Sequence, residues 1–164
     1  MDDIIELSGT SKGSFYYYFN TKDELLSTLS TVLDDYYEEL HVDMDKEMNN
    51  YDKLLYLNYK VHSMIEERIS IDLLASLYST QLIAKGQRHL LDQNRVYYRL
   101  ISGIIEDGQK KGQIRQDKSI SEITKYYSLC ERALISDWCL SRGDYSLGEY
   151  SKAYMPIMME HFKA

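Results

Sequence analysis

Residues 8–26 read SGTSKGSFYYYFNTKDELL and carry five aromatic side chains in one uninterrupted run. Gly9 and Thr10 separate two stretches with the spacing of helices, residues 3–8 and residues 12–19. Two short helices joined by a tight turn that contains glycine are typical of a helix-turn-helix. The stretch therefore predicts that motif near the start of the chain.

The second of these helices has two different faces. At about 100° per residue, Phe15 and Phe19 share one face, whereas Ser14 and Tyr17 point to the other. The phenylalanines are therefore expected to pack inward. Gly13 lowers helix stability unless another group must approach the backbone closely, and a DNA phosphate is such a group. The outward face is suited to phosphate and base contacts.

Composition limits the other possibilities. The 164 residues are 44% apolar and 27% charged, and no run approaches the roughly 18 uncharged apolar residues of a membrane span. The acidic start MDDIIE is unlike a secretory signal. We therefore expect a cytoplasmic protein with no membrane partner. The net charge of −7 argues against broad electrostatic binding to nucleic acid, so any DNA binding must be local.

The rest of the chain has the periodicity of helices. Thr21 and Glu24 form a capping-box pattern, after which apolar residues recur every three or four positions. No stretch alternates apolar and polar residues as a half-buried strand would. The ranges expected to be helical are 22–44, 52–68, 70–85, 88–111, 120–141 and 147–163. The sequence therefore predicts an all-α fold.

The stretch quoted above resembles the DNA-binding signature of the TetR family of bacterial transcriptional regulators. In that signature a glycine turn, Ser-Lys-Gly-Ser/Thr, an apolar-Tyr pair, a second aromatic pair and Lys-Asp/Glu-Glu-Leu follow in this order. The resemblance covers residues 3–26 and implies contacts with operator DNA by Lys12, Ser14, Tyr16, Tyr17, Tyr18 and Lys22. The alternative is that the tyrosines only cover a small aromatic core, but three adjacent positions of a helix cannot all face one core.

The resemblance also implies a domain organisation. Residues 1–44 correspond to a partial helix-turn-helix domain with its connecting helix, and residues 45–164 to a regulatory domain for ligand binding and dimerisation. The family has a further helix of some twenty residues before this pair, and the resemblance implies that the sequence starts after it, at the second helix. We expect Met1 to be an internal methionine of a longer native chain, with a shortened regulator of weakened DNA binding as the alternative.

A regulatory domain of this kind encloses an apolar pocket with a few polar groups. Candidates chosen by helical spacing are Tyr59, His62, Tyr78, Gln81, Tyr97, Tyr98, Ile101, Tyr127 and Glu131. For each residue alone, ordinary packing is the alternative, since buried tyrosines find hydrogen-bond partners in any core. As a group they predict an aromatic or amphipathic small-molecule effector.

The last two expected helices have broad apolar faces. The resemblance implies a two-fold homodimer in which both helices of each subunit form a four-helix bundle, matching a palindromic operator. The expected interface consists of Ile123, Leu134, Trp138, Tyr154, Ile157, Met158, His161 and Phe162. In a monomer the same residues would form the core.

Enzymatic interpretations are weak. Tyr56 and Lys60 have the Tyr-x-x-x-Lys spacing of short-chain dehydrogenases, but no glycine-rich strand-turn-helix accompanies them. His41 and Asp45 share a helix face, which is better explained as a solvated charged surface than as a metal site. We therefore expect no catalytic residue, no cofactor and no metal.

The sequence thus predicts a ligand-responsive transcriptional regulator. As a repressor it would bind a palindromic operator as a homodimer and be released by a small molecule. The alternative is a helical dimeric module that binds a small molecule or a protein and has lost DNA binding.

Overall fold

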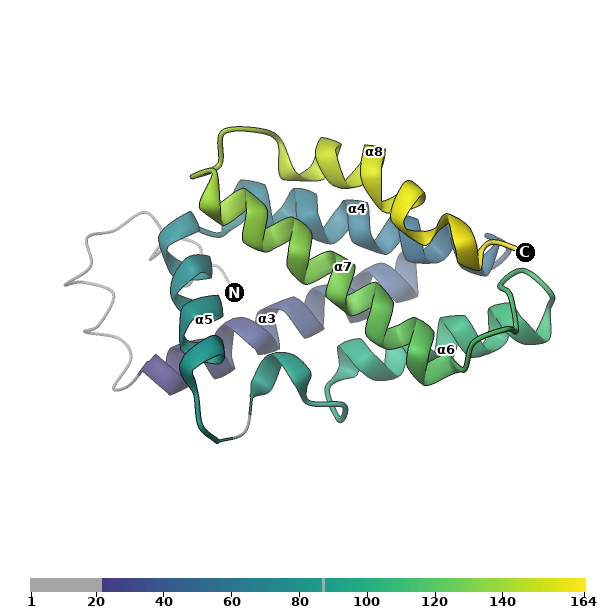
Figure 1. Cartoon of the computed structure of the whole chain (residues 1–164), viewed down its shortest axis with the longest axis horizontal. Coiled ribbons are helices and arrows are strands. Elements are labelled where there is room, and N and C mark those ends of the chain that lie inside the picture. The colour runs from purple at the N-terminus through teal and green to yellow at the C-terminus, as the bar shows by residue number, and fades with distance from the viewer. Residues whose placement is uncertain (1–21, 87) are drawn as a thin grey trace.

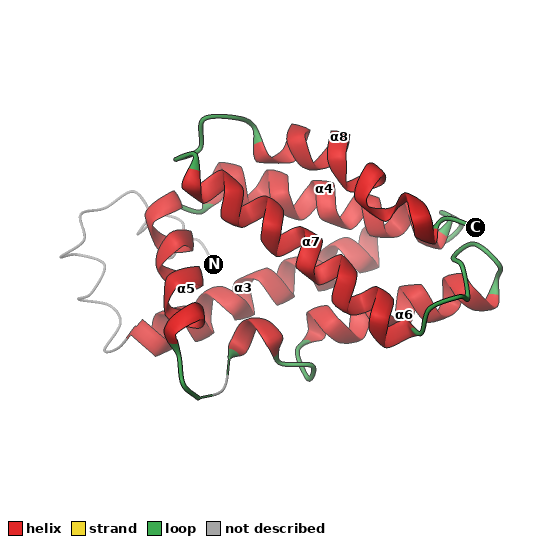
Figure 2. Cartoon of the chain, in the orientation of Figure 1, coloured by secondary structure: helices red, strands yellow, loops and turns green. Residues whose placement is uncertain are grey.

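Helices account for nearly all regular structure in the computed structural model, which describes residues 22–86 and 88–164 (Figure 2). The α-helices are α3 (Lys22–Asp43), α4 (Asn50–Arg68), α5 (Ile71–Ile83), α6 (Val96–Lys110), α7 (Ile120–Leu140) and α8 (Leu147–Met159). Two 3-10 helices, η1 (His89–Leu91) and η2 (Glu160–Phe162), accompany them. Within the described ranges the one β-type contact is an isolated bridge between Ile114 and Lys163. The all-α prediction is confirmed for these residues.

Most predictions for the N-terminal residues concern positions outside the part of the chain that the structure describes. The helices expected at 3–8 and 12–19 lie outside the described residues, as do the DNA contacts expected of Lys12, Ser14, Tyr16, Tyr17 and Tyr18. Lys22 begins α3, but its side chain is also outside the described part. These contacts therefore stay predictions.

Helix ends follow the local signals in the sequence. Ser119 accepts a hydrogen bond from the Glu122 backbone N–H, and the Glu122 carboxylate accepts one from the Ser119 N–H, which completes the expected capping box of α7. Gly112, just after α6, has a φ of +69°, a conformation that glycine adopts without steric cost. The predicted end of that helix is confirmed.

One predicted helix is wrong in its first part. Residues 88–111 were expected to form a single helix, but α6 begins only at Val96. The preceding 88–95 segment contains η1 and a turn in which the Asp92 carboxylate accepts the Asn94 N–H at 3.0 Å. A side chain that satisfies a nearby backbone donor competes with the helical hydrogen bond, and the helix therefore starts later.

The helices pack around α4, which contacts α3, α6 and α8. In Figure 1, α4 and α8 lie side by side and α7 crosses the face of the molecule towards α6. The α4–α8 approach is close at Gly148, where a Cβ atom would lie 3.2 Å from the Cα of Ser63. Only glycine fits this crossing without displacement.

A single core of buried apolar side chains extends from α3 to η2. Its α3 members run from Leu29 to Leu40, so this helix is part of the same core as α4–α8. The expected boundary between residues 44 and 45 stays a prediction. Within the described residues, no helix combines the length and apolar character needed to cross a bilayer.

Candidate functional site

A cavity of about 60 Å³ lies within the helical core, between α3, α4, α5, α6 and α7. By a measure in which one water needs about 10–15 Å³, it has room for about four to six waters or a few non-hydrogen atoms. Its walls are formed by Leu33, Tyr37, Val61, His62, Ile65, Tyr78, Leu90, Arg95, Tyr97, Tyr98, Ser128, Glu131, Arg132 and Ile135. Most of this lining is apolar or aromatic, as in typical small-molecule sites.

The carboxylate of Glu131 is the central polar group of the cavity. Glu131 occupies the stripe of α7 that also holds Tyr127 and Leu134, and this helical spacing carries it into the core, where it is only 4% exposed. Burial raises the pKa of Glu131, whereas hydrogen bonds that its carboxylate accepts oppose the shift. A buried carboxylate of this kind requires several donors.

Three side chains supply those donors. The Tyr97 hydroxyl donates to Oε1 at 2.5 Å, a length typical of a hydroxyl bound to a carboxylate. Tyr37 lies 3.3 Å from both carboxylate oxygens, and Asn58 Nδ2 donates to Oε2 at 2.9 Å. Burial and the nearby Glu131 charge keep the pKa of both phenols well above its ordinary value, so the hydroxyls remain donors.

His62 on α4 faces the same carboxylate. Its Nδ1 lies 2.6 Å from Ser151 Oγ on α8, and its Nε2 lies 3.6 Å from Glu131 Oε2. Burial lowers the pKa of His62 to about 3, which keeps the imidazole neutral near pH 7. Within the described part of the chain, His62 Nε2 and Asn58 Oδ1 are buried and have no hydrogen-bond partner.

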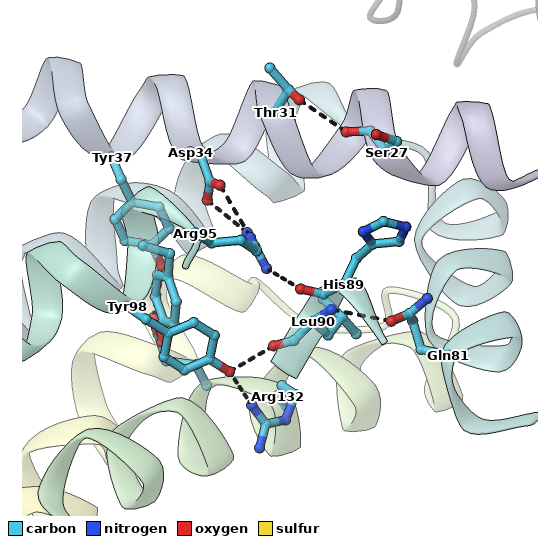
Figure 3. Close-up of polar contacts among 12 residues, drawn as sticks. Ser27, Thr31, Asp34, Tyr37, Gln81, His89, Leu90, Arg95, Tyr98 and Arg132 are labelled. Carbon is cyan, nitrogen blue, oxygen red and sulfur yellow. Dashed lines mark hydrogen bonds and ion pairs between the residues drawn. The ribbon is translucent and has the colours of Figure 1, made fainter. Parts of the chain in front are cut away.

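The 88–95 segment closes one side of the cavity with Leu90 and Arg95 (Figure 3). Leu90 is fixed at both backbone groups: its N–H donates to Gln81 Oε1 at 3.1 Å, and its carbonyl accepts from the Tyr98 hydroxyl at 2.6 Å. Arg132 in turn donates to the Tyr98 oxygen at 3.3 Å. The segment is therefore attached to α5, to α6 and, indirectly, to α7.

A second attachment joins this segment to α3. Arg95 donates to both carboxylate oxygens of Asp34, through Nη2 at 2.7 Å and through Nε at 3.1 Å. Its Nη1 also lies 3.4 Å from the His89 carbonyl oxygen. The cavity wall and α3 are thus connected by a two-point ion pair.

Comparison with known proteins bears on the part of the chain that leads into α3. Residues 1–29 match the family model of the bacterial regulatory proteins, tetR family. The match supports a transcriptional regulator of the TetR type and, with it, DNA binding. It ends inside α3, seven residues after that helix begins at Lys22. The comparisons with curated proteins and with solved structures gave no match.

The structure brings five of the nine expected ligand-binding residues to the cavity. These are His62, Tyr78, Tyr97, Tyr98 and Glu131. Gln81 does not line the cavity, but its side-chain oxygen accepts a hydrogen bond from the backbone N–H of Leu90, which does. The other three lie elsewhere: Ile101 is buried away from the cavity, Tyr127 donates to the Leu54 carbonyl oxygen at 2.8 Å, and Tyr59 contacts Glu149 and Lys152.

Several cavity residues were missed by reasoning from the sequence. Leu33 and Tyr37 belong to α3, whereas the ligand-binding prediction covers only the regulatory residues that follow this helix. Their signal was present, because they belong to an apolar stripe of α3 that runs from Leu29 to Leu40. Leu90 and Arg95 fall within the helix expected at 88–111. A regular helix there gives no reason to expect that this segment covers a cavity.

The expected dimer residues divide into two groups. Ile123, Leu134, Trp138 and Phe162 are at most 8% exposed within one protomer, so they belong to its own core. Tyr154 and Ile157 are exposed, His161 lies at the surface beside Asp117, and Met158 is partly buried. The reason is that α7 and α8 each have apolar residues on two faces, one inward and one outward. The outward members are Tyr126, Leu129, Leu140, Tyr150, Tyr154 and Ile157.

Proposed function

We propose that the protein is a ligand-responsive repressor of the TetR type whose effector binds in the cavity around His62 and Glu131. The observation that carries this proposal is the position of α3. The family match at residues 1–29 runs into this helix, and the same helix contributes Leu33 and Tyr37 to the cavity. A change at the cavity wall therefore acts directly on the element that follows the DNA-binding segment.

The coupling has a physical requirement. An effector shifts an equilibrium only by the difference between its affinities for the two states. Here the ligand-free protein binds its operator, and the effector favours an arrangement in which Tyr37 or the Arg95–Asp34 pair has moved. Tyr37 belongs to α3, and the ion pair with Arg95 attaches α3 to the cavity wall. The position of α3 therefore differs between the two states. Release from DNA follows.

A two-fold dimer is part of the proposal, with its contact on the outward faces of α7 and α8. Tyr126, Leu129 and Leu140 lie on one of these faces, and Tyr150, Tyr154 and Ile157 on the other. Exposed apolar residues grouped on neighbouring helices are typical of protein–protein contacts. The proposed interface therefore uses the outward residues of α7 and not its inward residues, which are already buried within the protomer. Two-fold symmetry then suits a palindromic operator.

A gel-shift assay with the DNA that flanks the protein's own gene tests the DNA-binding step. We expect binding that weakens steeply as salt rises, because phosphate contacts release counterions. Tyr17→Ala should lower the affinity about tenfold or more, as loss of a base or phosphate contact does. Tyr59→Ala is the matched control, since Tyr59 lies on α4 and contacts Glu149. Absence of salt-dependent binding would instead favour a ligand-binding module without DNA.

A further inference from the structure

We propose that the cavity selects a small organic cation, a primary or secondary amine whose ammonium group is held between Glu131 and His62. The proposal rests on the proposed function, because the cavity must first be the effector site. It adds the charge and the hydrogen-bonding character of the ligand.

The first argument is that, among the described residues, no cationic side chain forms an ion pair with the Glu131 carboxylate, and the charge of Arg132 acts on it only from a greater distance. Among the described residues, no Lys or Arg nitrogen lies within ion-pair distance of it, and the nearest basic group is the neutral His62 at 3.6 Å. The guanidinium of Arg95 is bound to Asp34. A buried carboxylate carries a desolvation cost of several kcal/mol, which an ion pair with good geometry offsets. A cationic ligand would provide that pair.

The second argument is the hydrogen-bonding character of the unpartnered atoms. The proposal includes the His62 tautomer that carries its proton on Nδ1 and donates it to Ser151 Oγ, so that Nε2 is an acceptor for the ligand. Nε2 faces Glu131 Oε2, a second acceptor, and the Asn58 amide oxygen one helical turn away also lacks a donor. The group that fits among acceptors is a donor with several N–H bonds. An ammonium has them, whereas a carboxylate ligand brings acceptors only.

The third argument is the aromatic lining. The rings of Tyr37 and Tyr97 meet edge to face with centroids 4.9 Å apart, and Tyr97 and Tyr98 do the same at 4.9 Å. Tyrosine rings beside a carboxylate favour organic cations through both cation–π attraction and apolar contact. The volume of about 60 Å³ accommodates the ammonium group with its first carbons, and a larger amine such as benzylamine would displace the Leu90 side of the wall.

Arg132 is the feature that opposes a cation. It lines the cavity, and its Nη1 lies 3.3 Å from the neutral Tyr98 hydroxyl. An anionic ligand would approach this guanidinium, so an anion must be included in the test. Arg95 lines the cavity too, but its charge is balanced by Asp34 at 2.7 Å.

Isothermal titration calorimetry of the full chain at pH 7 distinguishes the charges with three probes of one shape: benzylamine, benzyl alcohol and benzoate. We expect benzylamine to bind at least tenfold more tightly than benzyl alcohol, and benzoate more weakly than either. Glu131→Gln should reduce the affinity for benzylamine to that for the alcohol. Glu38→Gln removes the same charge from an exposed position of α3 and should leave the ranking unchanged.

The outcomes separate this proposal from the proposed function. If benzoate or benzyl alcohol binds wild type as tightly as benzylamine does, or if benzylamine does not bind, cation selection is overturned. Val61→Phe, which fills the cavity, is the second variant. If Val61→Phe loses the binding of the alcohol or of benzoate, the cavity is still the effector site. If all three probes bind Val61→Phe as they bind wild type, both proposals are overturned. Should Glu131→Gln not fold, as judged by circular dichroism, the wild-type ranking alone decides.

Discussion

Asp34 and Arg95 lie 61 residues apart in the sequence and form a two-point ion pair that joins α3 to the segment before α6. Both side chains are largely buried, with exposed fractions of 13% and 12%. A planar guanidinium bound to both oxygens of a carboxylate fixes the orientation of both groups as well as their distance. The pair therefore holds the cavity wall in register with α3.

Asp34→Asn should destabilise the fold by about 1.5–3 kcal/mol, the range for a hydrogen bond to a charged group. The reason is that the largely buried Arg95 guanidinium would lose its carboxylate. Urea unfolding measures the difference. Asp35→Asn, which makes the same change at the exposed neighbouring position, should stay within about 0.5 kcal/mol of wild type. Equal effects of the two substitutions would mean that the ion pair does not stabilise the fold.

His62 should make stability depend on acidity. Its folded-state pKa of about 3 lies below the ordinary value of 6.5, so between these values the unfolded chain binds a proton that the folded chain does not. Stability from this group is therefore complete above the unfolded pKa and falls as the pH decreases. Lowering the pH from about 7 to 5 should cost roughly 2 kcal/mol at this site. Glu131, whose pKa is raised by burial, changes stability in the opposite direction over part of this range.

Comparison of variants isolates the histidine. Chemical unfolding at several pH values should give a shallower acid loss for His62→Gln than for wild type. His161→Gln is the control, because His161 lies at the surface beside Asp117, and it should retain the wild-type dependence. Parallel pH profiles for wild type and His62→Gln would contradict the assignment.

Tyr97→Phe and Tyr127→Phe compare two buried hydroxyls with different acceptors. Tyr97 donates to the Glu131 carboxylate at 2.5 Å, whereas Tyr127 donates to the neutral Leu54 carbonyl at 2.8 Å. Loss of the charged bond should cost about 1.5–3 kcal/mol, and loss of the neutral bond about 0.5–1.5 kcal/mol. Urea unfolding of both variants gives the order. A larger cost for Tyr127→Phe would show that the carboxylate does not depend on the Tyr97 hydroxyl.

The sequence predicts those parts of the fold that neighbouring residues determine, and it misses those that depend on contacts with other helices. Helix ends were predicted where a few adjacent residues determine them, as at the Ser119–Glu122 box and at Gly112. The 88–95 segment was not, because apolar spacing continues through it while Asp92 forms a competing turn. Its position also depends on Asp34, 61 residues before Arg95, and on the Gln81 side chain of α5, and periodicity reveals neither contact.

The candidate site was partly predictable for a related reason. Helical phase placed His62, Tyr97 and Glu131 on inward faces, and they meet at the cavity. The phase of a helix with one apolar stripe is unambiguous, but α7 has two. Its inward stripe includes Leu134, and its outward stripe includes Leu129, which is 49% exposed. No local pattern distinguishes the stripe that packs within the protomer from the one left at the surface.

That ambiguity leads to a test of the proposed dimer at the outward stripe. Ile157→Glu on α8 should convert the dimer to monomer in sedimentation velocity, because a two-fold contact would place both copies of the introduced charge in an apolar interface. Ile157 is 64% exposed in the protomer, so its own fold should tolerate the change. Val42→Glu is the matched control, since Val42 is 68% exposed on α3 beside Val96 and Leu100 of α6, and should leave the dimer intact. Trp138→Ala and Phe162→Ala are unsuitable, because both side chains are buried in the protomer and each truncation would cost about 3–5 kcal/mol of its stability. Dimers that persist in Ile157→Glu would move the contact to another surface.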